Sequence, residues 1–304
     1  MPDTACARPP IEPVDIEGAT VAMGTHRFSI GTRALVMGIL NRTPDSFFDA
    51  GRYWAMDDSL RRVAEIVGQG ADIVDIGGVK AGPGDFVGTE EELDRVLPAV
   101  EAVADRFEVP ISIDTWRAQV ADAAIGAGAS LINDISGLMD PDMVPVAART
   151  GAGVVVCHIQ GRPRVANPDP QYDDLRGEVV GYMTERVGRC REAGIADERV
   201  VLDHGLDLGK NPQQSLELLA HTRDLTDMGL PVLLSASNKP FLGALLDRPV
   251  DARNPASLAT AAYAYCQGAR ILRVHDVIGT VRVRRVLEAI LEAWTARSTE
   301  SSER

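Results

Sequence analysis

Eight short apolar runs alternate with amphipathic segments along almost the whole chain, and this alternation is the feature that most limits its fold. The runs are residues 34–41, 72–78, 109–115, 130–136, 153–159, 199–205, 231–237 and 269–276. Near-continuous apolar runs are typical of parallel strands that are covered on both faces. Eight of them favour an α/β fold of the closed (β/α)₈ type, a TIM barrel, over an open doubly wound sheet, which needs a glycine-rich phosphate turn after its first strand. No GxGxxG motif follows the first run.

The segments between the runs have the periodicity of helices. In residues 56–71, for example, Leu60, Val63, Ala64 and Val67 recur at the spacing of one helix face. The other predicted helices cover residues 89–107, 116–128, 143–151, 173–194, 211–229, 257–268 and 281–296. One helix is therefore expected after each strand.

The chain of 304 residues fits one barrel domain with short additions. We expect the barrel to cover residues 19–296, and the weakly alternating residues 19–31 to form a hairpin that closes its floor. Residues 1–18 and 297–304 are polar or proline-rich, which predicts disordered tails.

Composition excludes several classes of function. The net charge of −13 argues against a nucleic-acid or anionic membrane surface, because basic patches supply most of the affinity for either. No apolar run is long enough to span a bilayer, and the first residues lack the apolar stretch of a signal peptide, so a cytoplasmic protein is expected. The four scattered cysteines predict neither a disulfide framework nor a zinc site.

Polar clusters end six of the apolar runs. They are NRTPDSF (41–47), SIDT (112–115), IND (132–134), LDHG (202–205), SNK (237–239) and RVHD (273–276). The carboxyl ends of the strands of a barrel meet at one mouth, so these clusters predict a common site.

Several of these residues also have a purely structural interpretation. Asp114 can face the mouth or cap the following helix, and of the neighbours Asn133 and Asp134 only one can point inward because side chains alternate along a strand. Arg273 and His275 are two residues apart and share a face. Asn41 can bind a metal or a phosphate oxygen, or simply belong to a turn.

A pocket with these groups suits a flat heterocycle that carries an anionic tail. Carboxylate and amide oxygens accept hydrogen bonds from ring N–H and amino groups, whereas Arg, Lys and His bind phosphate oxygens.

Taken together, the clusters resemble those of a known family, the dihydropteroate synthases. The match runs in order from about residue 34 to residue 276. Beside the clusters above it includes DIGG (75–78), HxQG (158–161), GLDLGKNP (205–212) and LRVHDV (272–277). The resemblance implies a homodimeric transferase of folate biosynthesis that joins p-aminobenzoate to 7,8-dihydropterin-6-ylmethyl diphosphate and releases pyrophosphate with Mg²⁺.

The resemblance also assigns roles. Asp114, Asn133, Asp203 and Lys239 would hold the pterin, Arg273 would stack near the ring and reach phosphate, and His275 with Asn41 would bind the diphosphate and its metal. Asp114, Lys239, Arg273 and His275 are the implied catalytic residues. The implied carbon–oxygen cleavage would need charge neutralisation on the leaving group and a carboxylate, Asp114, near the developing cation.

This chain departs from the family pattern on one side of the implied site. Ala81 and Gly82 stand where the family has a threonine and an arginine, Asp207 replaces a glycine and Leu208 an aromatic residue. Asn238 and Pro240 replace an arginine and a serine. These positions are the implied contacts of the aminobenzoate and of part of the diphosphate, and Lys80 is expected to compensate in part for the missing arginine.

Two interpretations remain open from the sequence. The first is a working dihydropteroate synthase, and the second is an inactive or repurposed paralogue that keeps the pterin pocket, as in the second synthase-like protein of mycobacteria, which this chain also resembles. The pterin module of a corrinoid-dependent methyltransferase is disfavoured by the Arg273-x-His275 pair. An apolar stripe in residues 281–296 suits a dimer contact or the barrel wall.

Overall fold

The computed structural model describes residues 16, 18–43 and 55–302, with side chains up to residue 293. Eight parallel strands close into a barrel in the order β10-β3-β4-β5-β6-β7-β8-β9, which confirms the predicted fold class. The barrel strands are β3 (Leu35–Asn41), β4 (Ile73–Gly77), β5 (Ile111–Asp114), β6 (Leu131–Asp134), β7 (Gly153–Cys157), β8 (Val200–Asp203), β9 (Val232–Leu234) and β10 (Ile271–Val274). Each lies within one of the eight predicted runs.

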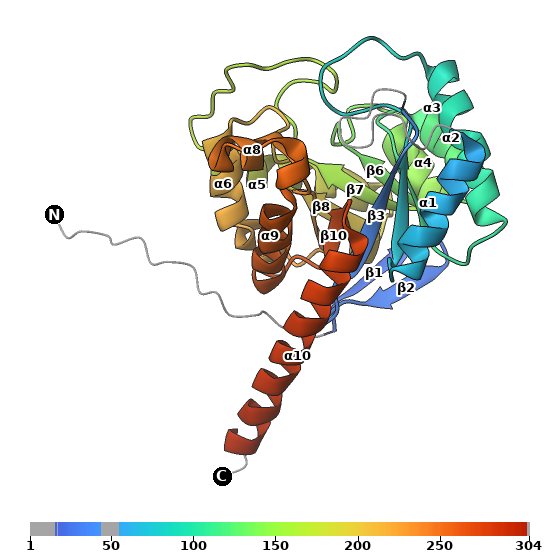
Figure 1. The fold of residues 1–304 in the computed structure, drawn as a ribbon. Coiled ribbons are helices and arrows are strands. Elements are labelled where there is room, and N and C mark those ends of the chain that lie inside the picture. Colours follow the sequence, from blue (N-terminus) through green and yellow to red (C-terminus); the bar gives the residue numbers. More distant parts are fainter. Residues whose placement is uncertain (1–15, 17, 44–54, 303–304) are drawn as a thin grey trace.

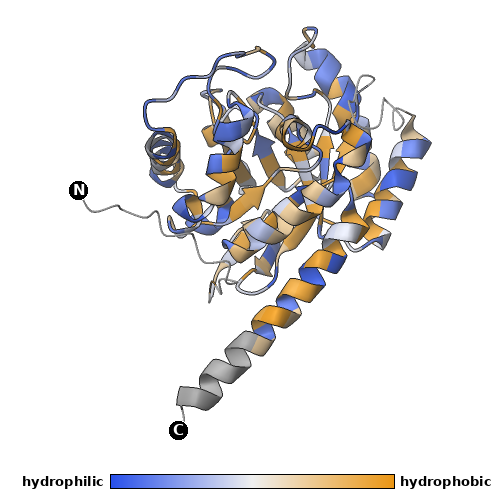
Figure 2. Cartoon of the chain, turned by 60° about the vertical axis from the view of Figure 1, so that its left-hand side comes forward, coloured by the Kyte–Doolittle hydropathy of each residue, from blue (hydrophilic) through white to orange (hydrophobic). Residues whose placement is uncertain are grey.

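Helices surround the barrel, with apolar faces toward the strands and polar faces outward (Figures 1 and 2). They are α1 (Met56–Gly68), α2 (Thr89–Ala104), α3 (Ala118–Gly126), α4 (Met143–Thr150), α5 (Leu175–Glu192), α6 (Pro212–Ala220), α7 (Arg223–Thr226), α8 (Pro240–Leu246), α9 (Asn254–Cys266) and α10 (Val277–Ser302). Two short 3₁₀ helices are η1 (Asp197–Arg199) and η2 (Val250–Ala252). None of the described helices is long and apolar enough to cross a membrane.

The helix pattern differs from the prediction in three places. The single helix expected over 211–229 is divided into α6 and α7 at His221, whose backbone at φ −111° and ψ 36° leaves the helical region. The hydroxyl of the buried Thr222 donates to the carbonyl of Leu219 at 2.8 Å beside this break. The extra helix α8 begins at Pro240, directly after the cluster SNK. Helix α10 is longer than the predicted 281–296 at both ends and continues to Ser302.

A hairpin of β1 (Thr20–Met23) and β2 (His26–Ser29) lies under the barrel (Figure 1). Its Val21 and Met23, together with Ile30, form one buried cluster with inward residues of the strands. Those strand residues are Leu35, Met37, Ile73, Leu131, Val155, Val201, Leu233 and Ile271. The predicted hairpin at the floor is therefore confirmed, and it seals the end of the barrel away from the polar clusters.

Candidate active site

The inward face of four strands changes from apolar to polar toward the mouth. Residues two apart on a strand share a face, so the floor residues Ile73, Leu131, Val201 and Ile271 place Asp75, Asn133, Asp203 and Arg273 inward as the next residues along each strand. Asp75, Asn133 and Asp203 are buried and Arg273 is half-buried. The barrel thus brings together the polar groups that the strand-tip clusters predicted.

Arg273 lies at the centre of this group. Its Nε donates to Oδ2 of Asp75 at 2.6 Å, and its Nη2 donates to Oδ2 of Asp114 at 2.6 Å. Asn133 extends the network, because its Nδ2 lies 3.4 Å from both carboxylate oxygens of Asp75. Two carboxylates from neighbouring strands therefore fix the plane of one guanidinium.

Asp114 has one oxygen that is not used by the protein. Its Oδ1 is buried and has no hydrogen-bond partner, and the same is true of the hydroxyl of Ser112 on the same strand face. Burial raises the pKa of Asp114 to about 7, and the nearby carboxylate of Asp75 adds to this rise while Arg273 opposes it. An unsatisfied buried acceptor is costly, so Asp114 is suited to accept a hydrogen bond from a ligand.

The neighbouring Asp134 points away from the mouth. Its Oδ1 accepts hydrogen bonds from the backbone and hydroxyl of Ser136, and its Oδ2 accepts one from the backbone of Leu138. Asn133 is thus the inward member of the pair, and Asp134 holds the turn that follows β6.

The loop of residues 203–210 after β8 positions two of the predicted ligand-binding residues. Oδ1 of Asp203 accepts from the backbone N of Gly205 at 2.9 Å, and Nζ of Lys239 donates to the carbonyl of Leu206 at 2.7 Å. Gly205 has φ +64°, and a Cβ there would lie 1.8 Å from the carbonyl oxygen of His158. Only glycine permits this close approach of the loop to the residue that follows β7.

A buried lysine, Lys210, holds that loop through hydrogen bonds to backbone carbonyls. Nζ of Lys210 donates to the carbonyls of His158, Gly205 and Leu208 at 3.0 to 3.2 Å. Burial lowers the pKa of Lys210 to about 7. Lys210 therefore fixes the backbone that in turn holds Asp203 and Lys239.

His275 follows β10 and is held by a serine. The hydroxyl of Ser237, after β9, lies 3.0 Å from Nδ1 of His275 and accepts a hydrogen bond from its backbone N at 3.2 Å. Burial lowers the pKa of His275 to about 3, and the charges of Arg273 and Arg62 act in the same direction. The imidazole is therefore neutral at pH 7.

Asn41 ends β3, half-buried, in the register position beside Gly77. The next residue, Arg42, is buried, and its guanidinium donates to the carbonyl of Arg95 at 3.2 Å and to the hydroxyl of Ser59 at 2.7 Å. The remainder of the predicted cluster, from residue 44 on, lies outside the described residues. Among the described residues, no group of three or more His, Cys, Asp or Glu side chains is arranged to hold a metal.

The loop after β4, which carries Ala81 and Gly82, is held by a side chain from another loop. Nη1 of Arg164 donates to the carbonyls of Lys80 and Gly82 at 3.1 Å, and its Nη2 donates to the carbonyl of Asp85. The backbone N of Arg164 also donates to the carbonyl of Ala81 at 3.2 Å. These two loops lie above the barrel in Figure 1.

The corner between β9 and α8 contains two of the substituted positions. Asn238 is buried with φ +57°, and its side chain accepts a hydrogen bond from the hydroxyl of Ser257 at 3.1 Å. Pro240 is the first residue of α8 and has no N–H to donate. Asn238 therefore stabilises the corner and is turned toward α9.

Three residues of this site, Asp75, Lys210 and Ser237, were given no role in the sequence prediction, although they lie in the motifs DIGG (75–78), GLDLGKNP (205–212) and SNK (237–239). For Asp75, its position two residues after Ile73 on one strand was a signal for an inward side chain. Lys210 and Ser237 act through contacts between different loops, and their motifs do not show those contacts.

Several known proteins are similar to this chain in sequence. The sequence pattern of the family described as "Pterin binding enzyme" matches residues 37–275. The dihydropteroate synthase of Escherichia coli K12 is 44% identical over 259 residues, which cover 85% of this chain and 92% of the relative. A protein of Mycobacterium tuberculosis named inactive dihydropteroate synthase 2 is also 44% identical, over 266 residues that cover 86% of this chain and 83% of the relative.

Solved structures agree with these sequence matches. The Yersinia pestis dihydropteroate synthase in a sulfonamide drug complex superposes with a TM-score of 0.86 at 41% identity, covering 90% of this chain and 99% of the other. The Xanthomonas albilineans dihydropteroate synthase with 4-aminobenzoic acid superposes with a TM-score of 0.82 at 36% identity, covering 89% and 97%.

Proposed function

The chain belongs to the dihydropteroate synthase family of pterin-binding enzymes, and we propose that it joins p-aminobenzoate to 7,8-dihydropterin-6-ylmethyl diphosphate and releases pyrophosphate. The observation that carries this proposal is the group of inward polar side chains at the barrel mouth, centred on Arg273 between Asp75 and Asp114. Such a group matches a flat ring with donor edges and an anionic tail.

The ring would be held by acceptors and a cation that the fold already fixes. Asp114 and Asp203 supply carboxylate oxygens, and Asn133 supplies both an amide oxygen and an amide N–H. Lys239, held by the carbonyl of Leu206, supplies a donor from the opposite loop. The unused buried Oδ1 of Asp114 supports this assignment.

In the proposed reaction a carbon–nitrogen bond forms and a carbon–oxygen bond breaks. The amine nitrogen of the second substrate forms a bond to the methylene carbon, the carbon–oxygen bond breaks, and its electron pair leaves with pyrophosphate, while the amine loses a proton to solvent. Arg273 and the neutral His275 can donate hydrogen bonds to the leaving oxygens, and Asp114 lies on the side where positive charge develops.

A magnesium ion fits this scheme through Asn41. Mg²⁺ in proteins is commonly held by one or two protein oxygens, several waters and substrate phosphates. The single amide oxygen of Asn41 at the tip of β3 suits such a site, and a bound ion would neutralise part of the diphosphate charge. We therefore propose that the reaction uses Mg²⁺, held by Asn41 and the diphosphate.

A homodimer in the cytoplasm is part of the same proposal. Val286 and Ile290 of α10 are 60% and 47% exposed, whereas Leu291 of the same helix is buried. This helix thus buries Leu291 and leaves two large apolar side chains exposed, which supports a dimer contact. Sedimentation equilibrium tests this, since V286E with I290E is expected to shift a dimer to monomer.

The synthase activity is tested by steady-state assay with both substrates and Mg²⁺. We expect turnover in the wild type and a loss of roughly 10²-fold or more in H275A, because a donor to the leaving group is removed. An exposed control, D94N, is expected to keep wild-type turnover. A wild-type rate no higher than that of H275A would contradict the proposal.

One observation favours a second function, a pterin-binding paralogue without synthase activity. The loop after β4 offers neither a hydroxyl nor a guanidinium at Ala81 and Gly82, and its carbonyls are occupied by Arg164. The loss of one charge-assisted contact to a dianionic leaving group costs about 1.5–3 kcal/mol. Growth of a folate-requiring host that lacks its own synthase, supported by this chain alone, would exclude the second function.

A further inference from the structure

Both ends of the loop after β4, residues 78–87, are held by arginines beside Asp114. Nη1 of Arg95 donates to the carbonyl of the first residue of the loop at 2.8 Å, and Nη2 of Arg117 donates to the carbonyl of the last. Arg117 follows Asp114 by three residues in the chain. A Cβ at Gly77, directly before the loop, would lie 3.4 Å from Cβ of Asp114. The loop therefore begins and ends next to β5, the strand that carries Asp114.

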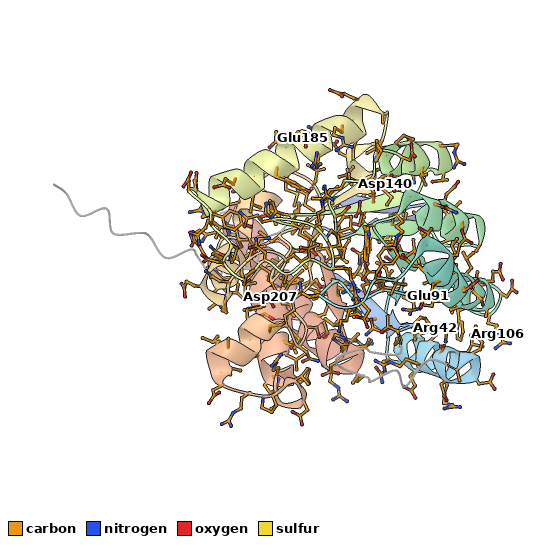
Figure 3. All side chains as sticks on the ribbon, turned by 90° about the horizontal axis from the view of Figure 1, so that it is seen from above. Arg42, Glu91, Arg106, Asp140, Glu185 and Asp207 are labelled. Atoms are coloured by element: carbon orange, nitrogen blue, oxygen red, sulfur yellow. The ribbon has the colours of Figure 1, made fainter. Side chains whose placement is uncertain are left out.

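The arginines at the two ends are themselves fixed by carboxylates of α2. Arg95 forms an ion pair with Glu91, and Arg117 forms one with the fully buried Glu92. Arg42 belongs to the same group, because its Nε donates to the carbonyl of Arg95 at 3.2 Å. Figure 3, which looks at the barrel from above, shows Arg42 and Glu91 close together. The ends of the loop are thus tied to a helix of the barrel wall.

The middle of the loop is held by a single residue of a different loop, Arg164, which follows β7. Nη1 of Arg164 donates to the carbonyls of Lys80 and Gly82 at 3.1 Å, and Nη2 donates to the carbonyl of Asp85. A Cβ at Gly84 would lie 2.5 Å from Nη2 of Arg164. The backbone of the loop after β4 therefore packs directly against the guanidinium.

Arg164 makes these contacts in an uncommon backbone conformation and without a counter-charge. Its φ is +69°, in the left-handed region that an arginine seldom adopts, and such strain persists where the surrounding contacts enforce it. Its backbone N donates to the carbonyl of Ala81 at 3.2 Å. Within the part of the chain that the structure describes, no carboxylate pairs with Arg164. Its side chain is therefore committed to the backbone of the neighbouring loop.

The place of the two loops in the barrel relates this contact to the site. Strands β4 and β7 lie on either side of β5 and β6, whose ends carry Asp114 and Asn133. The contacts of Arg164 thus connect the rim on both sides of these two residues.

We propose that Arg164 is a positioning residue that holds the loop after β4 in one conformation before any ligand arrives, so that residues 78–87 form a fixed rim of the pterin site. Without Arg164 only the two ends of the loop stay fixed, and the middle has to be ordered when a ligand binds. That ordering costs conformational entropy. Arg164 thereby increases ligand affinity without touching the ligand. The effect on affinity rests on the proposed function, whereas the order of the unliganded loop does not.

The first test is digestion of the full chain by chymotrypsin without ligand. Phe86 is 87% exposed, but Arg164 and Arg117 hold the backbone on its two sides, so cleavage requires the loop to open. We expect cleavage after Phe86 to be about tenfold faster or more in R164A. R162A, which removes an exposed guanidinium from the same loop, is expected to behave like the wild type. Cleavage after the exposed Leu245 of α8 is the internal reference for global unfolding and should stay constant.

Two glycine variants separate the contacts of Arg164 from its charge. In G84A the new methyl group would lie 2.5 Å from Nη2 of Arg164 and must displace the guanidinium, whereas in G82A it meets no atom within 4 Å. We expect faster cleavage after Phe86 in G84A and an unchanged rate in G82A. R164K keeps a cation with three donors but not the planar fork, so its rate should lie between those of wild type and R164A. Each rate is normalised to cleavage of a peptide of residues 80–92 with the same substitution.

The second test is calorimetric titration with 7,8-dihydropterin-6-ylmethyl diphosphate. We expect Kd to rise about 3- to 10-fold in R164A and to stay at the wild-type value in R162A. If the folded wild type binds no pterin, the proposed function fails, while faster cleavage in R164A and G84A still supports the fixed loop. Equal cleavage rates in wild type and R164A, or faster cleavage with an unchanged Kd, would overturn the inference.

Discussion

Arg273 and Asp75 form a buried ion pair inside the barrel, with Nε of the arginine 2.6 Å from Oδ2 of the carboxylate. Asp75 is fully buried and also lies 3.4 Å from the amide nitrogen of Asn133. This pair places a fixed cation between strands β4 and β10 before any ligand binds. Preorganised charge of this kind avoids the cost of rearrangement when an anionic group arrives.

The first prediction concerns this pair. In D75N the guanidinium loses its fully buried counter-charge, so we expect a loss of about 3 kcal/mol in the free energy of unfolding and at least a tenfold weaker affinity for the pterin diphosphate. Urea denaturation and calorimetry measure the two effects. D94N, an exposed change of the same type on α2, serves as control and is expected to alter neither quantity. Unchanged ligand affinity in D75N would show that Asp75 does not position Arg273.

The second prediction concerns the serine that contacts His275. In S237A the imidazole loses its hydrogen bond at Nδ1, so we expect affinity for the pterin diphosphate to fall about 3- to 10-fold. Affinity for the same dihydropterin without a diphosphate is expected to stay unchanged. S237T keeps the hydroxyl and should bind like the wild type. Equal weakening for both ligands would assign Ser237 to general stability.

The affinity for a dihydropterin is expected to depend on pH through Asp114. The pKa of Asp114 is raised to about 7, and only the ionised carboxylate accepts a hydrogen bond at both oxygens. We therefore expect dihydropterin affinity to rise as pH increases through about 7, and to fall by up to about tenfold per unit below it. The ligand's own titration affects wild type and D114N equally, so the ratio of their dissociation constants isolates Asp114. A ratio that is constant from pH 5.5 to 8.5 would count against this assignment.

The fourth prediction uses the buried lysine. Because the folded state lowers the pKa of Lys210 to about 7, the folded protein binds fewer protons than the unfolded chain between pH 7 and about 10. Stability from this group therefore increases with pH in that range, by up to about 1.4 kcal/mol per unit, and is lowest below pH 7. The difference in unfolding free energy between wild type and K210M should show this slope. K80M removes a lysine from the rim loop and is expected to follow the wild-type slope.

Local pattern was sufficient for the architecture of this protein. Apolar runs such as residues 72–78 and 153–159 predicted the strands. Alternation along residues 130–136 predicted that only one of Asn133 and Asp134 points inward, and the structure shows that it is Asn133. The break between α6 and α7 was missed because residues 211–229 contain no proline or glycine near His221, where the backbone leaves the helical region. Helix α8 was not predicted. Its first residue, Pro240, directly follows the cluster SNK, which was interpreted only as the end of a strand.

The structure brings several of the predicted site residues together through supporting contacts that were not predicted, and their roles toward a ligand stay predictions. Asp114, Arg273 and His275 follow from their places at strand ends, whereas their partners come from other strands and loops. Lys210 touches three carbonyls of two separate loops, and Arg164 reaches the loop after β4 from a segment about 80 residues away along the chain. Such contacts are set by the closure of the barrel, which the sequence pattern does not specify residue by residue.

The most direct test of the account is calorimetric titration of the full chain with 7,8-dihydropterin-6-ylmethyl diphosphate and Mg²⁺, in wild type and in D203N. We expect saturable binding of one ligand per chain, and at least a tenfold weaker affinity in D203N, since one ring acceptor becomes a mixed donor and acceptor. Heat-capacity measurements on the unliganded proteins confirm that both are folded. The absence of saturable binding by folded wild type, or equal affinity in D203N, would contradict the claim that these strand-tip side chains hold a pterin ring.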